Sequence, residues 1–397
     1  MQPTTLRRIL IACSAYPPDI KGGGEKSVQI LAQSLSTRGH TVRILTVADK
    51  AGDRLDGDGA TRISQVASPN IYWNFHPQSS TFKKVIWHAL DNFNPRATRV
   101  VAKAIQDFRP DIVVSSSLEN FGPAIWRASR RMGVPVVHIL RSYYVKCLRG
   151  TMFSNGRSCD GACAECSVLT LGRRVAARDV NGLIGISDFI LNQHIPIFPK
   201  AMHLSIPNAV PATDTPVRRR AVAPVVTFGY LGRLEPEKGI QEILEVFGQL
   251  PDHCHLLVAG TGRDDYASKL REKYSSERIR FVGWVPAESV YPVIDFAVIP
   301  SLWNEPFGRV VIEAYAHGVP VVAAARGGLT ELVRDGVTGY LFDPAIPSDL
   351  QAACMRAVAA MPSYDHLAAA AREESARYRP SEIARAYEKF FDTVLNG

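Results

Sequence analysis

The chain has 397 residues, which is enough for two or three domains of ordinary size. Hydrophobic residues make up 46% and charged residues 21%, a balance that is typical of globular proteins and excludes collagen-like, coiled-coil and disordered chains. The charge is uneven, because residues 1–220 hold 29 Lys and Arg against 15 Asp and Glu, or +14, and the remainder hold 17 against 23, or −6. Such an asymmetry indicates an anionic partner for the first half, and nucleic acid or an anionic membrane surface would both fit.

The sequence shows no apolar run near the ~18 residues that a membrane span needs. Its first apolar run, at 9–12, is too short for a signal peptide. Seven cysteines in such a long chain are too few for a disulfide scaffold and favour a reducing compartment. We therefore expect a cytoplasmic protein, with peripheral attachment to the inner membrane face as the alternative.

The first half predicts alternating strands and helices. A strand over 7–13 leads into a Gly-rich loop at 22–24, an amphipathic helix that ends at Gly39 and a second strand over 41–46. Short aliphatic runs at 111–115, 135–140, 182–187 and 203–207 predict further buried strands. Strands alternating with helices form parallel sheets, so residues 1–208 are expected to make a doubly wound, Rossmann-like domain.

A second domain of the same class is expected after a linker. Residues 209–224 contain several prolines and three consecutive arginines without periodicity, which indicates a linker. Strands then recur from Val225, so 225–379 predict a second Rossmann-like domain, and the helix over 380–397 is expected to return to the first domain. The fold class is therefore α/β with two parallel sheets, whose ligands should bind at the carboxyl ends of the strands, in a cleft between the domains.

Two loops are candidate anion-binding sites. Gly23 and Gly24 come directly before a helix, whose bare amides and dipole attract anions, although a flexible turn explains them as well. Arg233 and Lys238 follow a strand end and can both reach one diphosphate, which needs no metal if water is excluded. Such a pair can equally be a solvated surface. The local sequences do not match a P-loop or a dinucleotide-binding fingerprint.

A pair of glutamates stands eight residues apart, at Glu305 and Glu313. Pro306 suits a first helical position, which would place Glu305 at the helix entry and Glu313 about two turns inside. The resulting distance disfavours the carboxylate pair of a glycosidase. The amides of Phe307 and Gly308, between the glutamates, would form a further anion-binding site.

With these residues the chain resembles family 4 retaining glycosyltransferases of the GT-B fold. The resemblance covers nearly the whole chain and rests on the glycines at 22–24, on Arg233 with Lys238, and on the Glu305 and Glu313 pair. It implies a nucleotide-diphosphate sugar as the donor, UDP-sugar among the candidates, and a glycan or lipid-linked acceptor. It also implies transfer of a hexose with retention, in surface polysaccharide or glycolipid synthesis.

The resemblance also implies roles for single residues. Arg233, Lys238 and the Gly308 amide would hold the diphosphate, Glu313 the ribose hydroxyls and Glu305 the donor sugar. His138 would lie near the donor sugar, although a histidine at a strand end is as often structural. No cofactor is implied for catalysis.

Four cysteines depart from the family pattern. Cys147, Cys159, Cys163 and Cys166 fall within twenty residues, in an insert at 147–166. Four thiolates can close a structural zinc site, but the long first gap is not that of a standard zinc ribbon, and four reduced, unligated thiols explain the cluster as well.

The stretch at 82–90 combines lysines with Phe82 and Trp87 and could lie on an anionic membrane, or form an ordinary helix with its tryptophan inside. Two other functions stay open at this point. One is a nucleotide-sugar epimerase of similar architecture. The other is a non-catalytic, zinc-containing nucleic-acid binder. That function would leave the candidate anion-binding sites unexplained, so no nucleic acid is expected.

Overall fold

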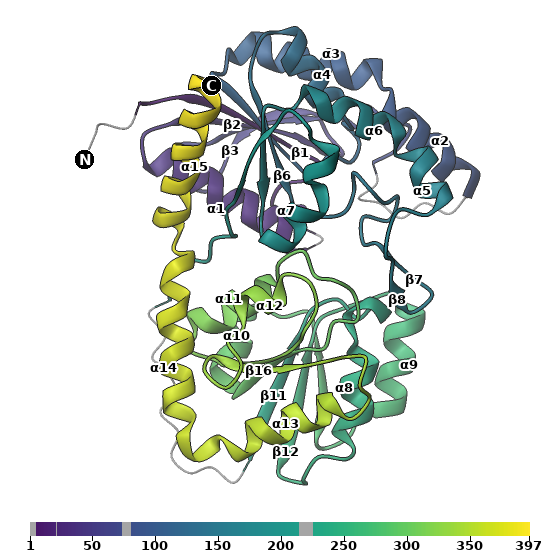
Figure 1. The fold of residues 1–397 in the computed structure, drawn as a ribbon, viewed down its shortest axis with the longest axis vertical. Coiled ribbons are helices and arrows are strands. Elements are labelled where there is room, and N and C mark those ends of the chain that lie inside the picture. The colour runs from purple at the N-terminus through teal and green to yellow at the C-terminus, as the bar shows by residue number, and fades with distance from the viewer. Residues whose placement is uncertain (1–4, 21, 74–80, 214–224) are drawn as a thin grey trace. The chain divides into compact units, whose positions relative to one another are not determined.

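The structure is a computed structural model that describes residues 5–20, 22–73, 81–213 and 225–397. Its chain forms two compact units (Figure 1). The first unit comprises Met1–Met152, Asp160–Ala209 and Pro380–Gly397, and the second comprises Phe153–Cys159 and Val210–Arg379. The short segment Phe153–Cys159 thus groups with the second unit, whereas the sequence assigned the whole of 1–208 to the first. Of the expected linker, residues 214–224 lie outside the described residues.

The first unit is built on an eight-stranded sheet with the strand order β10-β9-β6-β5-β1-β2-β4-β3. All neighbours are parallel except β3 and β4. Its strands are β1 (Arg8–Cys13), β2 (Thr41–Val47), β3 (Gly52–Leu55), β4 (Arg62–Val66), β5 (Ile112–Ser116), β6 (Val136–Leu140), β9 (Gly182–Gly185) and β10 (Met202–Ser205). The antiparallel edge formed by β3 and β4 was not predicted, because both strands are short and more than half polar.

The helices of this unit fill the connections between the parallel strands. They are α1 (Gly23–Thr37), α2 (Thr81–Asn92), α3 (Pro95–Phe108), α4 (Ala124–Arg131), α5 (Ala164–Leu169), α6 (Leu171–Ala176), α7 (Asp188–His194) and α15 (Pro380–Asn396), with 3-10 turns η1 (Ala177–Asp179) and η2 (Ile195–Ile197). Their starts follow local chemistry. The Asn94 side chain, for example, accepts a hydrogen bond from the Ala97 amide, and Pro95 takes the first helical position of α3.

Helix α15 completes the first unit. It lies beside α1 (Figure 1), and its Glu388 accepts hydrogen bonds from Arg38 at 2.5 Å and pairs with the buried His40 at 2.9 Å. A Cβ on Gly182 of β9 would meet Val394 and Phe390 of this helix within 2.9 Å. The last helix of the chain is therefore packed as part of the first unit's core.

The second unit has a six-stranded, entirely parallel sheet with the order β13-β12-β11-β14-β15-β16. The strands are β11 (Val226–Leu231), β12 (Cys254–Ala259), β13 (Ile279–Gly283), β14 (Phe296–Ile299), β15 (Val321–Ala324) and β16 (Gly339–Phe342). A separate hairpin pairs β7 (Phe153–Ser154) with β8 (Arg157–Ser158). The main sheet has the doubly wound order of mononucleotide-binding folds, in which β12 and β13 are added on one side of β11 and β14, β15 and β16 on the other. The order of strand addition therefore reverses between β11 and β14, and all strands stay parallel.

Helices again connect these strands. They are α8 (Ile240–Phe247), α9 (Asp264–Tyr274), α10 (Ala287–Val290), α11 (Arg309–Ala316), α12 (Leu329–Leu332), α13 (Asp349–Ala359) and α14 (Tyr364–Ser375), with 3-10 turns η3 (Pro236–Lys238), η4 (Tyr291–Val293), η5 (Met361–Ser363) and η6 (Ala376–Tyr378). The predicted α/β class with two Rossmann-like sheets is confirmed. Within the described part of the chain, no helix has the length and apolar character that a bilayer crossing requires.

Candidate functional site

The candidate site of the second unit lies at the point where the order of strand addition in its sheet reverses, between β11 and β14. Parallel sheets bind ligands at the carboxyl ends of the two strands that flank this point, here β11 and β14. The loop after β11 carries Arg233 and Lys238, and the loop after β14 carries Glu305. The two loops are joined by the backbone, because the amides of Leu302 and Trp303 both donate to the Glu237 carbonyl, at 3.0 and 3.3 Å. Residues 67 positions apart are thereby brought together.

An ion pair forms the centre of this site. Lys238 Nζ donates to Glu305 Oε1 at 2.7 Å, and Ser301 Oγ donates to the same oxygen at 2.8 Å. The Lys238 ammonium also lies 4.8 Å from the centre of the Trp303 ring. Only 8% of Glu305 is exposed, whereas the Lys238 side chain keeps 21%. The cation is thus held in place from one side and remains accessible from another.

The environment keeps Glu305 ionised. Burial alone would raise its pKa, but the charge of Lys238 and the hydrogen bonds from Lys238 and Ser301 outweigh burial and hold the pKa below its ordinary value. A neutral glutamic acid could not anchor the ammonium in this way. The pair therefore presents one positioned positive charge at the carboxyl end of the sheet.

The turn from Glu305 to Gly308 precedes the helix that follows it. Helix α11 begins at Arg309 with Gly308 as its N-cap, so the expectation that Pro306 occupies a first helical position is wrong. Gly308 has a φ of 112°, and a Cβ there would lie 2.4 Å from Leu329. Only glycine fits this left-handed, crowded position. The Gly328 amide donates to the Glu305 carbonyl at 2.7 Å and fixes the other side of the turn.

Glu313 lies within α11 and has its own cation. Arg309 Nε donates to Glu313 Oε1 at 2.7 Å, one helical turn away, and Tyr291 Oη lies 3.4 Å from Oε2. The Glu313 side chain keeps 17% of its surface exposed. Phe307, by contrast, is 3% exposed, and its ring packs edge-on against Tyr378. The Phe307 side chain is therefore a core anchor, and only its backbone could serve a ligand.

Arg233 lies at the outer edge of the same loop. Its guanidinium pairs with Glu235 at 2.8 Å and lies 3.8 Å from Glu237, and 47% of its side chain is exposed. The loop keeps its shape partly through Tyr230, whose hydroxyl donates to the Arg233 carbonyl at 2.7 Å. Arg233 and Lys238 thus lie on one loop, the first about half exposed and the second paired with the buried Glu305.

The Gly-rich segment belongs to the first unit. Gly23 and Gly24 form the first turn of α1, and the Gly22 amide donates to Glu25 Oε2 at 3.1 Å. A Cβ on Gly22 or Gly24 would meet nothing within 4 Å. The backbone of this helix start is therefore open to close approach, at the carboxyl end of β1 and beside the reversal point of the first sheet.

His138 does not lie at the sheet edge. It occupies the middle of β6, is 4% exposed, and its Nδ1 lies 3.0 Å from Ser115 Oγ. Its ring packs against Trp126 and Phe198, and burial lowers its pKa to about 3. These contacts are those of a structural core histidine.

The residue that follows β6 at the sheet edge is Arg141, which the sequence analysis did not single out. Its Nε donates to Ser116 Oγ at 2.8 Å, and its Nη1 donates to Asn208 Oδ1. Counting from the predicted end of the strand would have found it, since β6 ends at Leu140.

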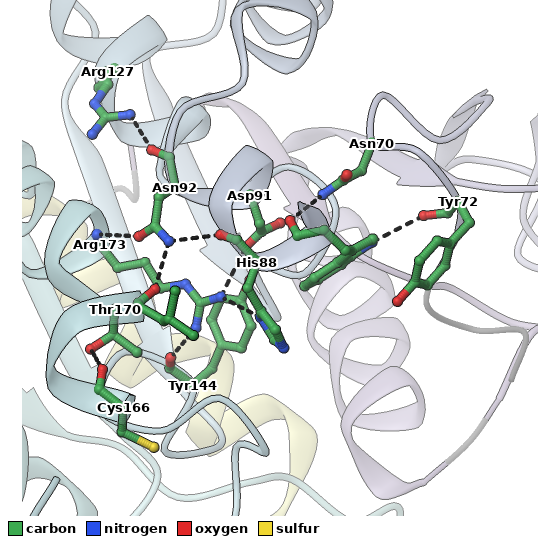
Figure 2. A network of polar contacts seen from close by, with 12 residues as sticks. Asn70, Tyr72, His88, Asp91, Asn92, Arg127, Tyr144, Cys166, Thr170 and Arg173 are labelled. Carbon is green, nitrogen blue, oxygen red and sulfur yellow. Dashed lines mark hydrogen bonds and ion pairs between the residues drawn. The ribbon is translucent and has the colours of Figure 1, made fainter. Parts of the chain in front are cut away.

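A buried polar network supports the loops of the first unit (Figure 2). At its centre Arg173 of α6, with no exposed side-chain surface, lies 3.2 Å from Asp91 Oδ2 and donates to the Tyr144 carbonyl at 2.7 Å. Its guanidinium also lies over the Tyr144 ring, 3.6 Å from the centroid. Asn92 Nδ2 donates to the carbonyls of His88 and Leu169. The network joins α2, α6 and the loop after β6.

The charges of this network are not balanced. Two buried carboxyl groups, Asp91 and Glu119, face the single guanidinium of Arg173. Burial raises the pKa of Asp91 to about 7, and it also raises the pKa of Glu119. Burial and the neighbouring Arg173 lower the pKa of His88 to about 4, so this ring is neutral. No periodicity in the sequence signals this cluster.

The four cysteines of the insert are not arranged as a metal site. Cys147 and Cys166 are buried, Cys159 is half-buried and Cys163 is exposed. Across the residues that the structure describes, which include all four, no three His, Cys, Asp or Glu side chains form a group suited to a metal ion. The thiols present therefore do not fit the structural zinc that the sequence offered as one reading.

The hairpin near these cysteines has a different role. Ser158 Oγ accepts a hydrogen bond from the Asn304 amide at 3.1 Å, directly before Glu305. The contact agrees with the grouping of Phe153–Cys159 with the second unit. No sequence pattern predicts this contact, because the two residues are 146 positions apart.

Two family models match the chain. The model of the glycosyl transferase 4-like domain matches residues 22–209, and the model of glycosyl transferases group 1 matches residues 222–374. The first match holds the Gly-rich segment and the second holds Arg233, Lys238, Glu305 and Glu313. The chain belongs to the group 1 glycosyltransferases. The family resemblance inferred from these residues is therefore confirmed.

Curated relatives share sequence with this group 1 glycosyltransferase. An uncharacterized 42.6 kDa protein in the cps region of Klebsiella pneumoniae is 28% identical over 82% of this chain and 87% of its own length. A D-inositol 3-phosphate glycosyltransferase of a Mycobacterium species is 30% identical over 58% of this chain and 55% of the relative, so the match spans about half of that protein.

Solved structures share the fold. The crystal structure of Anabaena HepE in complex with UDP and glucose has a TM-score of 0.70 with 19% identity, and the match covers 98% of this chain and 100% of that one. At this identity the likeness establishes the GT-B architecture alone. The specific donor and acceptor have to be argued from the site.

Proposed function

We propose that this glycosyltransferase moves a hexose from a UDP-sugar to an acceptor hydroxyl with retention of the anomeric configuration. The observation that carries the proposal is the 2.7 Å contact between Lys238 and Glu305 at the reversal point of the second sheet. A fixed ammonium, with the Arg233 guanidinium on the same loop, can neutralise a diphosphate as it leaves, without a metal ion.

The residues suggest how the donor is held. Lys238, Arg233 and the Gly308 amide would bind the diphosphate, and Glu313 would accept hydrogen bonds from the ribose hydroxyls. Glu305 would orient the donor sugar through its second carboxylate oxygen while it anchors Lys238. Gly23 and Gly24 of the first unit stay candidates for donor binding, through the open backbone at the start of α1.

The proposed step needs no protein nucleophile. The bond between the anomeric carbon and the phosphate oxygen breaks, and its electron pair stays on the diphosphate. The acceptor oxygen then forms its bond to the anomeric carbon on the same face, and its proton passes to the leaving phosphate oxygen. Preorganised cations are worth most in such a step because the leaving group gains charge only as the bond breaks.

The relatives support a biological setting. The relative in the cps region of Klebsiella pneumoniae favours a part in surface polysaccharide or glycolipid synthesis, with a glycan or lipid-linked acceptor. Helix α2 supports peripheral contact with an anionic membrane, since Phe82 and Val85 are exposed beside Lys83 and Lys84. Trp87 faces inward, at 3% exposure, and takes no part in that surface.

The donor is tested by thermal shift. UDP-, GDP-, ADP- and TDP-glucose are added to the full chain with and without EDTA, and we expect UDP-glucose to raise the melting temperature in both conditions. A shift that EDTA abolishes would contradict metal-free binding of the diphosphate. If no nucleotide sugar shifts the protein in either condition, the proposal is wrong.

The ion pair is tested by turnover of UDP-glucose. We expect Lys238→Met to lower kcat/KM by about 10²–10³, in line with the loss of one donor to a developing anion. Lys269→Met, on the exposed face of α9, is the matched control and should retain activity. The double variant Lys238→Met/Glu305→Gln leaves no lone buried carboxylate, so it separates a loss of activity from a loss of folding. Full activity in both Lys238→Met and Glu305→Gln would refute these roles.

A further inference from the structure

A cavity of about 180 Å³ lies within the second unit, away from the loops of the candidate donor site. The described residues that line it are Val210, Pro211, Ala212, Thr213, Ala316, Arg372, Ser375 and Arg379. A water molecule takes up roughly 30 Å³ in the liquid, so the cavity has room for a ligand of several non-hydrogen atoms.

The lining has the chemistry of an anion site. Two arginines, Arg372 and Arg379, and two hydroxyl residues, Thr213 and Ser375, line the cavity together with small apolar residues. The described lining contains no Asp or Glu. Guanidinium groups match the oxygen geometry of phosphate and bind it through charge-assisted hydrogen bonds.

The cavity is made from the two stretches by which the chain passes between its units. Val210–Thr213 directly follow Ala209, where the first unit is left, and Ser375 and Arg379 directly precede Pro380, where it is entered again. The two stretches are hydrogen-bonded, since the Val210 amide donates to the Tyr378 carbonyl at 2.9 Å. A ligand in the cavity would therefore contact both stretches together.

The cavity also shares a helix with the candidate donor site. Ala316 is the last residue of α11, the helix that starts at the Gly308 turn and carries Glu313. Arg372 Nη1 donates to the Ala316 carbonyl, where it offsets the negative end of this helix. The Tyr378 ring packs on Phe307, with centroids 6.2 Å apart. The same short helix thus borders the cavity at one end and the donor turn at the other.

We propose that this cavity binds a small phosphate-type anion between Arg372 and Arg379, and that the anion joins the two crossover stretches to the end of α11. The ligand is either inorganic phosphate or the phosphate group of a small phosphorylated metabolite. This binding does not depend on the proposed donor.

The test is a thermal-shift titration of the full chain with sodium phosphate, at constant ionic strength set with sodium chloride. We expect a saturable rise in melting temperature. Arg379→Gln should raise the midpoint concentration at least about fivefold, the loss of one charge-assisted contact. Arg377→Gln is the matched control. It also removes one arginine charge, two residues before Arg379, but the Arg377 side chain pairs with Glu374 and does not line the cavity.

A further arm of the experiment tests whether phosphate binds at the candidate donor site instead of the cavity. If the phosphate shift is lost in Lys238→Met and kept in Arg379→Gln, phosphate binds at the donor site and the proposal is overturned. Equal midpoints for wild type and Arg379→Gln, or a shift that does not saturate, overturn it as well. Glucose 6-phosphate is titrated in parallel. A lower midpoint than that of inorganic phosphate, with the same dependence on Arg379, identifies a phosphorylated metabolite as the ligand, and a higher one identifies the free ion.

Discussion

The Arg173 network of the first unit and the candidate-site loops of the second unit hold their charged side chains in opposite ways. In the first unit Arg173 and Asp91 have no exposed side-chain surface and join elements of the scaffold to one another. In the second unit Lys238 and Arg233 keep 21% and 47% of their side chains exposed, on loops at the carboxyl end of the sheet. Both arrangements are ion pairs, but only the second can exchange its partner for a ligand.

The difference follows from the cost of burial. A charge that is removed from water on all sides must keep its partner, since its loss leaves an uncompensated charge in a medium of low dielectric constant. A half-exposed cation has water as an alternative and can be turned toward an incoming anion. The buried network should therefore control folding, and the exposed pairs should control binding. Three substitutions test this division.

The largest effect is expected for Arg173→Met. The change leaves Asp91 and Glu119 without the cation that faces them, so we expect the free energy of unfolding to fall by about 3–5 kcal/mol. Urea denaturation measures it. The matched control is Arg130→Met, which removes an arginine that pairs with Asp179 at 2.7 Å but is 73% exposed, and should cost less than about 1 kcal/mol. Equal losses in the two variants would show that burial does not separate these pairs.

A second effect concerns pH and isolates Asp91. Burial raises its pKa from 3.8 to about 7, so the folded chain binds the proton more tightly than the unfolded chain does. The stability that this proton contributes is complete below pH 4 and is lost as the pH rises to about 7.

Asp91→Asn removes this titration. The difference in unfolding free energy between wild type and Asp91→Asn should therefore change between pH 4 and 7, by up to about 1.4 kcal/mol per pH unit, and be constant above pH 8. Urea denaturation at a series of pH values measures it. A difference that is constant over the whole range would contradict a raised pKa at this position.

The smallest effect is expected at Ser158. This residue groups with the second unit, although β9 and β10 of the first unit follow it in the sequence. Ser158→Ala removes the acceptor of the Asn304 amide, at a cost of about 1 kcal/mol. We expect a severalfold rise in KM for UDP-glucose with little change in kcat, measured by initial rates. Ser154→Ala, in the other strand of the same hairpin, is the control and should behave as wild type. An unchanged KM would mean that the contact does not position the Glu305 turn.

The sequence predicted well what local chemistry determines. The β-branched strands and the loop from Arg233 to Lys238 lie within a few residues of their causes, so both parallel sheets could be predicted, apart from the antiparallel edge formed by β3 and β4. The partner of Lys238 was nevertheless not predicted. That contact depends on the reversal point of the sheet, which places two loops side by side.

The errors have the same origin. His138 was placed at a strand end, but β6 continues for two more residues, so the edge position falls to Arg141. For the four cysteines, the spacing left a zinc site and unligated thiols open, because spacing alone does not determine how thiols are arranged in space. Arg173 and Asp91 are 82 positions apart, and no pattern along the chain connects them.

The passage of α15 into the first unit has a consequence for synthesis. Once residue 379 has left the ribosome, the second unit has all of its segments, while the first still lacks Glu388, the partner of His40 and Arg38. Chains usually fold their N-terminal domain first during translation. Here the order of completion is reversed, and the first unit lacks the core contacts of α15, those of Phe390 and Val394 near Gly182 among them, until residues 380–397 have been made.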